Sequence, residues 1–260
     1  MAANLLIMRP LPIAASASAG GTNPAFCLTP TPKEAWSIPA NTTATMDLDL
    51  GSAQDVDTFF VGYHTAAAIS QTWKVEARAT LGGTVTGTPV PTMPLLLDGS
   101  DAPTHGFFRS STPKISTPVN SRYWRFTFTN PTGQPTLLIP VLALGLSFQP
   151  TYGHEYGAGR PIGDTGTTER LFGGDFALDP GAVFGGYSFT MGDLSEVERK
   201  ALYRYLRKLG TSRSLLVVED PEVVDELNDR LHWCVFAKIE AYERYGVGVT
   251  RWSLKVDDWA

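Results

Sequence analysis

The first 150 residues contain almost no helical periodicity, and this constrains the fold more than any other feature of the sequence. Their apolar residues form short runs between Pro, Gly, Thr and Asn, a pattern typical of strands and turns. Met46, Leu48 and Leu50 alternate with Asp47 and Asp49, as in a strand with one wet face. Further strands are expected at 57–63, 72–79, 122–129 and 136–149, with a break or a sheet edge at Pro140. Several strands without intervening helices indicate an antiparallel β-sandwich.

Composition changes near residue 150. Residues 1–150 hold 16 charged side chains and 16 prolines, whereas residues 151–260 hold 31 charged side chains and 3 prolines. This shift predicts two domains, 1–150 and 151–260, joined by the stretch 149–161, which is rich in Gly and Pro. Within the first domain we expect a flexible loop at 14–21 and long loops over 81–117, at one end of the sandwich.

The second domain contains one clear helix, at 194–209. Its apolar residues recur at spacings of three and four, and Gly210 ends it. Asp193 with Glu196, or Ser195 with Glu198, would form a capping pair at its start. Strands are expected at 170–177, 183–190, 214–219, 231–242 and 246–256, with a turn near 245–246 and a short acidic helix or a loop at 222–230. The fold class is therefore mainly β: a jelly-roll sandwich followed by a small α+β domain with one main helix.

Charge and cysteine content exclude several classes of protein. With 21 basic and 26 acidic residues, the chain has no excess positive charge to hold a nucleic-acid backbone. No apolar run approaches the length of a membrane-spanning helix, and the N-terminus lacks the features of a signal peptide, so maturation in a cytoplasm is expected. Cys27 and Cys234 have no zinc-site spacing. Two buried free thiols are the favoured interpretation, and a disulfide between them is the alternative.

Motifs for catalysis are missing. The sequence contains no P-loop, no GxSxG nucleophile elbow and no HExxH zinc helix, and its four histidines are widely separated. The carboxylate pairs Asp47/Asp49, Asp55/Asp57 and Asp257/Asp258 fit a wet strand face, a turn and a solvated end. We therefore expect no enzyme, no metal site and no cofactor. A hydrolase with an unrecognised site is the third alternative.

Aromatic residues supply the candidate contact sites. Trp73, Trp124, Trp233 and Trp252 lie in strand-like apolar runs and are expected in the core. Trp259, the penultimate residue, would anchor a neighbouring subunit if it is exposed. The candidate ligand or partner contacts are Trp36, His105, Arg109 and Trp259.

The order of motifs over about residues 20–148 resembles the discoidin, or coagulation-factor type C, family of galactose-binding-like jelly rolls. The motifs are the segments 23–28 and 33–36, the LDLG of 48–51, the WKV of 73–75, the RYWRF of 122–126 and the LG of 144–145. The chain lacks the family's bracketing cysteines and its usual opening aspartate near 29–31. Ligand residues in this family lie on variable loops, so the resemblance implies a fold and carries over no binding residue.

The second domain resembles the distal-tail proteins of long-tailed bacteriophages, through an aromatic strand, the LSEVE of 194–198, the DP of 220–221 and the WSLKV of 252–256. The resemblance implies a non-enzymatic structural component of a tail tip or baseplate, located in the virion and assembled in the host bacterial cytoplasm. Its partners would be further copies in a trimer or hexamer, the tail tube, hub and fibres, and surface saccharides, but neither nucleic acid nor membrane. The alternative is a stand-alone carbohydrate-binding or adhesion module.

Overall fold

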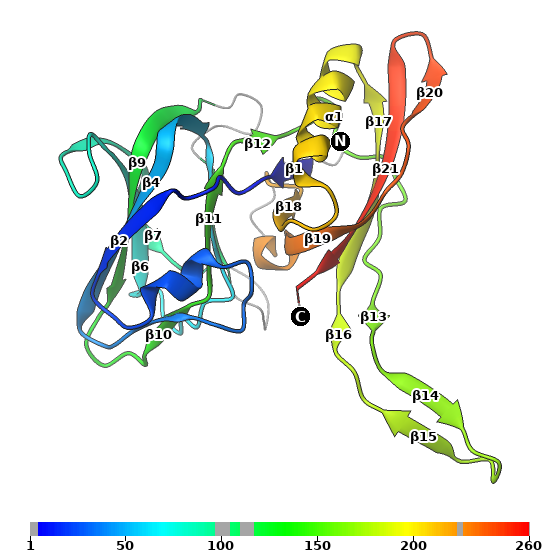
Figure 1. The fold of residues 1–260 in the computed structure, drawn as a ribbon, viewed down its shortest axis with the longest axis horizontal. Coiled ribbons are helices and arrows are strands. Elements are labelled where there is room, and N and C mark those ends of the chain that lie inside the picture. The colour runs from blue at the N-terminus through cyan, green and yellow to red at the C-terminus, as the bar shows by residue number, and fades with distance from the viewer. Residues whose placement is uncertain (1–4, 97–104, 110–116, 223–225, 260) are drawn as a thin grey trace. The chain divides into compact units, whose positions relative to one another are not determined.

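A computed structural model describes residues 5–96, 105–109, 117–222 and 226–259 (Figure 1). The chain divides into two compact units, which we name the sandwich unit and the arm unit. The sandwich unit comprises 6–148 and 216–231, and the arm unit comprises 1–5, 149–215 and 232–260. The division between residues 148 and 149 lies beside the junction expected near residue 150. Residues 1–5, however, belong to the arm unit, and residues 216–231 belong to the sandwich unit.

Antiparallel sheets build the sandwich unit. The larger sheet has the order β2-β4-β9-β6-β7, with β2 (Ala15–Ala19), β4 (Thr42–Val56), β9 (Val119–Asn130), β6 (Thr72–Arg78) and β7 (Val85–Pro94). The smaller sheet has the order β11-β5-β8, with β11 (Val141–Gly145), β5 (Thr58–Gly62) and β8 (Gly106–Arg109). The remaining elements are the pairs β10 (Leu137–Ile139) with β3 (Trp36–Ile38) and β1 (Leu5–Met8) with β12 (Ser147–Phe148), and the 3₁₀-helices Pro24–Leu28 and Leu227–Arg230. The break expected at Pro140 falls between β10 and β11.

Aromatic side chains fill the core between the two sheets. Met46, Leu48 and Leu50 of β4 point inward, as their alternation predicts. Phe59 of the smaller sheet lies 5.4 Å from Trp124 of the larger one, measured between ring centres. Because a buried aromatic side chain removes about 150–250 Å² from water, these rings dominate the stability of the unit. The mainly β fold class is confirmed.

Two expectations for the sandwich unit are wrong. Residues Ala15–Ala19 form the edge strand β2, although a flexible loop is expected there. They pair through the backbone with β4, and all five side chains are exposed. The sequence therefore shows no alternation of apolar and polar residues from which the strand could be predicted. Part of the expected loop over 81–117 forms β7 and β8; residues 97–104 and 110–116 lie outside the described residues. β7 contains Pro89 and Pro91 and tolerates them because it lies at the sheet edge with an irregular register.

The arm unit contains a further antiparallel sheet. In it, β21 (Val249–Asp258) pairs with β17 (Gly186–Leu194), β19 (Leu231–Ile239) and β20 (Glu243–Gly246). The turn before β21 lies at Val247 and Gly248, directly after the expected position near 245–246, and Gly248 has a φ of 75°. The strand β18 (Leu215–Glu219) begins in this unit and continues in the sandwich unit.

The helix α1 (Glu196–Leu209) packs against β17 and β21. Its buried face consists of Arg199, Leu202, Leu206 and Leu209, so the helix and its apolar stripe are confirmed, but Val197 is exposed. Of the two expected caps, Ser195 and Glu198 form the capping box.

Candidate functional site

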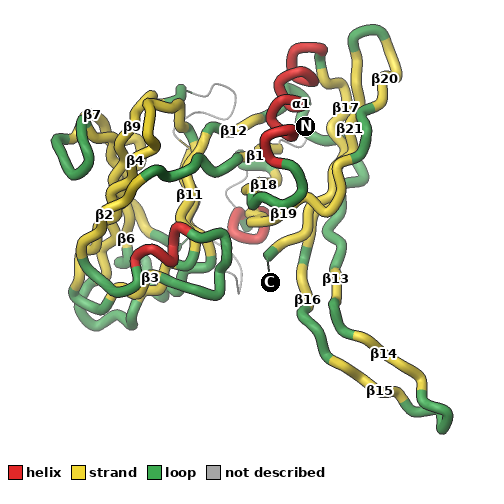
Figure 2. Tube along the Cα trace, viewed as in Figure 1, coloured by secondary structure: helices red, strands yellow, loops and turns green. Residues whose placement is uncertain are grey.

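A long β-hairpin extends from the arm unit as a two-stranded ribbon (Figures 1 and 2). We call residues 160–185 the arm. It consists of β13 (Gly163–Asp164) paired with β16 (Val183–Phe184), and β14 (Thr167–Arg170) paired with β15 (Phe176–Asp179). The single strand expected at 170–177 is wrong, because the chain reverses at Gly173 and Gly174. Gly174 has a φ of 93°, which a residue with a side chain rarely adopts.

The two faces of the outer arm carry different side chains. In the pairing of β14 with β15, Thr168 lies opposite Leu178 and Arg170 opposite Phe176, so these four side chains share one face. The Arg170 guanidinium lies 5.7 Å from the centre of the Phe176 ring. The other face carries Thr167, Glu169, Ala177 and Asp179. Both large apolar side chains of this strand pair, Phe176 and Leu178, therefore lie on the same face, beside Thr168 and Arg170.

None of the arm residues is buried within the described structure. Six large apolar side chains on the arm are exposed: Ile162, Leu171, Phe172, Phe176, Leu178 and Val183. Phe172 at the tip is fully exposed. Because soluble proteins rarely leave so many large apolar side chains together in water, this concentration marks an interaction surface.

A cavity of about 440 Å³ lies at the other end of β17, within the arm unit. Its walls come from the predicted linker, with Tyr152, His154, Glu155 and Tyr156, and from Gly192 and Asp193 before α1. The linker is tied to β17 by hydrogen bonds from Glu155 N–H to Thr190 O (2.8 Å) and from Gly159 N–H to Ser188 O (2.9 Å). The glycine-rich composition of the linker predicted irregular structure but gave no indication of a cavity.

Polar groups of the cavity wall already have partners within the unit. Arg251 Nη2 donates to Glu155 Oε2 at 2.6 Å, and the Tyr245 hydroxyl donates to Asp193 Oδ1. The hydrogen bond to the Asp193 carboxylate raises the pKa of Tyr245 above its usual value. His154 Nε2 lies 3.1 Å from the Tyr187 hydroxyl. The rings of Tyr152 and Tyr156, in contrast, are open to solvent.

The four candidate contact residues have different surroundings. Trp36 is buried, and its indole N–H donates to Gly20 O at 3.1 Å. His105 is also buried, with its backbone N–H bound to Asn228 Oδ1 at 2.8 Å. Arg109 Nε lies 3.9 Å from Asp57 Oδ2, and burial lowers the pKa of Arg109 although Asp57 opposes the shift. Trp259 is half-buried and donates its backbone N–H to Trp233 O at 3.0 Å. Their role as partner contacts stays a prediction.

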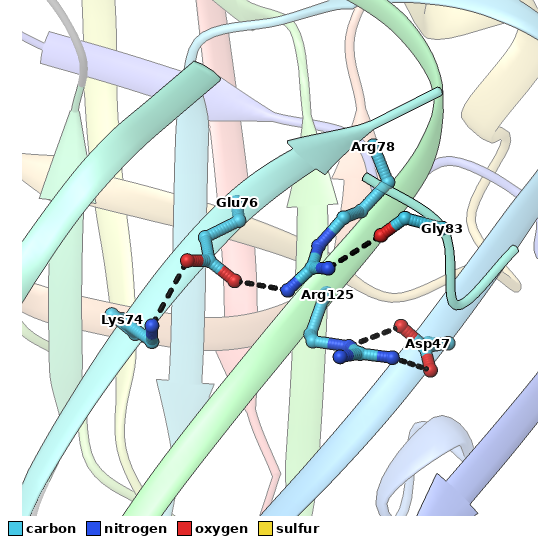
Figure 3. A network of polar contacts seen from close by, with 6 residues as sticks. All are labelled: Asp47, Lys74, Glu76, Arg78, Gly83 and Arg125. Atoms are coloured by element: carbon cyan, nitrogen blue, oxygen red, sulfur yellow. Dashed lines mark hydrogen bonds and ion pairs between the residues drawn. The ribbon is translucent and has the colours of Figure 1, made fainter. Parts of the chain in front are cut away.

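The expected wet face of the larger sheet carries paired charges (Figure 3). Arg125 binds both oxygens of Asp47 at 2.6 and 2.7 Å, and Glu76 lies between Lys74 and Arg78. Burial would raise the pKa of Glu76, but hydrogen bonds from these two cations hold it below its usual value. Asp47 thus pairs with a neighbouring strand, whereas Glu76 pairs with two cations of its own strand β6.

The other carboxylates and the cysteines have structural surroundings too. Asp57 is buried and accepts hydrogen bonds from Ser147 N–H (2.8 Å) and the Ser147 hydroxyl (2.9 Å), and Asp258 lies 3.0 Å from His232 Nδ1. Cys27 and Cys234 are buried free thiols. Among the described residues no group of three or more His, Cys, Asp or Glu side chains is placed to hold a metal ion. No helix in the described part of the chain is long and apolar enough to cross a membrane.

No protein-family model matches the sequence, and no curated protein matches it. Among solved structures, a GH29 fucosidase of Ruminococcus gnavus in complex with fucose is 13% identical with a TM-score of 0.39, over 52% of this chain and 25% of that chain. The match therefore spans about a quarter of the fucosidase. A chitosan-binding module of a chitosanase/glucanase from Paenibacillus sp. IK-5 is 14% identical with a TM-score of 0.38, over 52% of this chain and 98% of the module.

A carbohydrate-binding module, CBM32-1, of a family 31 glycoside hydrolase from Clostridium perfringens is 12% identical with a TM-score of 0.33, over 53% of this chain and 98% of the module. Two of these three structures are carbohydrate-binding modules. None of the three is a tail protein.

Proposed function

We propose that the protein is a non-enzymatic structural subunit that assembles with further copies of itself through the arm. The observation that carries the proposal is the ribbon with its six exposed large apolar side chains, which nothing within the described structure covers. An isolated two-stranded hairpin is marginally stable in water, so a ribbon of this length needs a surface to pack on. A neighbouring subunit supplies that surface in an assembly.

The size of the exposed apolar surface supports a stable contact. An aromatic side chain contributes about 150–250 Å² when it is buried. Phe172 and Phe176 together therefore offer up to about 300–500 Å². The four exposed aliphatic side chains of the arm add to this area, towards the roughly 800 Å² per partner found in a standard interface.

The finer role is a place in a bacteriophage tail tip or baseplate, with the virion as location and the tail tube, hub and fibres as neighbours. It rests on the sequence resemblance of the second domain to distal-tail proteins. An arm that reaches out to a neighbour fits a subunit of a ring around a tail axis, and a closed trimer or hexamer would satisfy every arm.

Light scattering on the purified chain over a concentration series tests the proposal. We expect a discrete oligomer, and we expect the double variant Phe176→Ser/Leu178→Ser to shift it towards monomer. Ile69→Ser is the matched control, because Ile69 is a comparably exposed apolar residue outside the arm. A chain that stays monomeric at every concentration would overturn the proposal.

Saccharide binding by the sandwich unit is the second candidate function. A cluster of three residues on the larger sheet, Arg122, Asp49 and Tyr123, favours this function. Arg122 donates two hydrogen bonds to Asp49, of 2.7 and 2.8 Å, and its guanidinium carbon lies 4.9 Å from the centre of the Tyr123 ring. Planar polar groups beside an aromatic ring suit sugar hydroxyls and a sugar ring. A glycan array with Arg122→Ala as the negative variant tests it, and an array without any bound glycan removes the candidate.

A further inference from the structure

The tip of the arm is a compact apolar knob. Leu171 N–H donates to Asp175 O at 2.8 Å and Gly174 N–H donates to Leu171 O at 2.9 Å, so the turn is held by its own backbone. Leu171 and Phe172 project from this turn into solvent. The position of the knob is set by the paired strands behind it.

The cavity offers the complementary surface. Three polar side chains of its wall, Glu155, Asp193 and His154, already form hydrogen bonds with other residues of the arm unit. The part of the cavity wall that remains available for contact with a bound side chain consists mainly of the rings of Tyr152 and Tyr156 and the glycine-rich backbone around them. An apolar side chain can enter such a cavity without breaking an ion pair, whereas a charged guest would have to compete with Arg251 or Tyr245.

The knob and the cavity of one copy lie at opposite ends of one chain path. From the tip, β15, β16 and β17 follow one another to Gly192 at the cavity (Figure 1). At about 3.3 Å per residue in extended chain, the eighteen steps from Gly174 to Gly192 span about 60 Å. The tip therefore cannot reach the cavity of its own copy, but it can reach that of a neighbour.

We propose that Leu171 and Phe172 at the arm tip of one copy occupy the cavity between Tyr152 and Tyr156 of the next copy. The contact is head-to-tail, because each copy uses its tip in one interface and its cavity in the other. This inference rests on the proposed function, since it names the site at which the self-assembly occurs. The partner is a second copy because the chain carries both an exposed apolar tip and a cavity whose polar groups are already bonded, and the exposed apolar area of the arm approaches what a standard interface buries.

Site-specific cross-linking between two variants tests the docking. Copies with Leu171→Cys are mixed with copies with Ala158→Cys, which leaves Phe172 and both tyrosines in place, and a short bismaleimide is added. The native thiols are buried and do not interfere. We expect a covalent dimer whose linked peptides contain positions 171 and 158. Replacing Leu171→Cys by Ile69→Cys is the matched control and should give no such dimer.

A second measurement gives the energetic weight of the tip. We expect Phe172→Ser to weaken self-association about 30-fold, as for a central aromatic residue of an interface, and Phe172→Leu to weaken it less. An oligomer that forms without the 171–158 cross-link and is insensitive to Phe172→Ser overturns the docking and leaves the proposed function standing. A chain that does not self-associate at all overturns both.

Discussion

Gly166 and Gly181 face each other across the arm with their backbones in close contact. A Cβ atom on Gly166 would come 2.7 Å from the backbone nitrogen of Gly181, and one on Gly181 would come closer still to Gly166. The two strands therefore meet at a point that only glycine allows.

We predict that Gly181→Val separates the strands at this point and disorders the outer arm. Limited proteolysis should then cut within 165–182, and self-association should weaken while the melting temperature of the folded units changes little. Gly173→Ala is the control, since nothing lies within 4 Å of a Cβ at that position. An arm in Gly181→Val as resistant to protease as in the unsubstituted chain would contradict the assigned strand contact.

Stability should depend on pH through His64. This buried side chain accepts a hydrogen bond from Ala66 N–H at Nδ1 (3.2 Å), and its Nε2 lies 3.1 Å from Leu95 O, so one neutral tautomer satisfies both partners. Burial lowers the pKa of His64 from 6.5 to about 4, against hydrogen bonds that oppose the shift. Between these two values the unfolded chain binds the proton and the folded chain does not. Folding is therefore fully stabilised above pH 6.5 and progressively less so towards pH 4.

The expected loss between pH 6.5 and pH 4 is about 3 kcal/mol at most, since one pKa unit corresponds to about 1.4 kcal/mol. Urea unfolding at several pH values measures it. In His64→Asn the slope of stability against pH over this window should become shallower. Equal slopes for both chains would show that His64 is not the titrating group.

Asn130 should be the most sensitive polar residue of the sandwich unit. It is fully buried, donates to Ile38 O and Pro135 O at 3.0 Å each, and accepts from Gln71 Nε2 at 2.9 Å. Asn130→Ala leaves these groups without their partner, and we expect unfolding free energy to fall by about 2–3 kcal/mol. In the control Asn120→Ala, which removes an exposed hydrogen bond to Asp55, the change should stay within about 0.5 kcal/mol. Similar losses in the two variants would contradict this assignment.

The helix start gives a smaller, local prediction. The Ser195 hydroxyl accepts from Glu198 N–H at 3.3 Å, and the Glu198 carboxylate accepts from Ser195 N–H at 3.0 Å. Ser195→Ala should lower the stability of the arm unit by about 1 kcal/mol, measured by thermal unfolding followed by circular dichroism. Ser195→Thr keeps the hydroxyl, which also donates to Glu198 Oε2 at 2.6 Å, and should recover most of the loss. A full loss in both variants would contradict the capping role of the hydroxyl.

Sequence reasoning succeeded where side-chain burial repeats. Met46 and Leu48 alternate because one face of β4 is dry, and Leu202, Leu206 and Leu209 repeat because α1 lies on a sheet. It failed for β2, whose alanines and serines are held by backbone pairing alone. No pattern of side chains can report such a strand.

The candidate site was harder to predict for a related reason. The arm buries no side chain, so its strands lack the contrast between inside and outside that a sequence pattern records. Gly173 and Gly174 were the available sign of a reversal, and Tyr152 and Tyr156 among glycines were the sign of exposed rings. Neither sign specifies that a knob and a cavity belong to the same unit.

The arm also has an uneven count of residues between its paired segments. Thr165 and Gly166 separate β13 from β14, whereas three residues, from Pro180 to Ala182, separate β15 from β16. The extra residue between β15 and β16 shifts the register by one position, and such a shift turns the side chains of a strand to the opposite face. The arm can therefore be lengthened or shortened only in steps of two residues per strand if Phe176 and Leu178 are to keep their orientation. The length of the arm and the face to which its apolar side chains point are in this way coupled, so a redesigned arm has to preserve both.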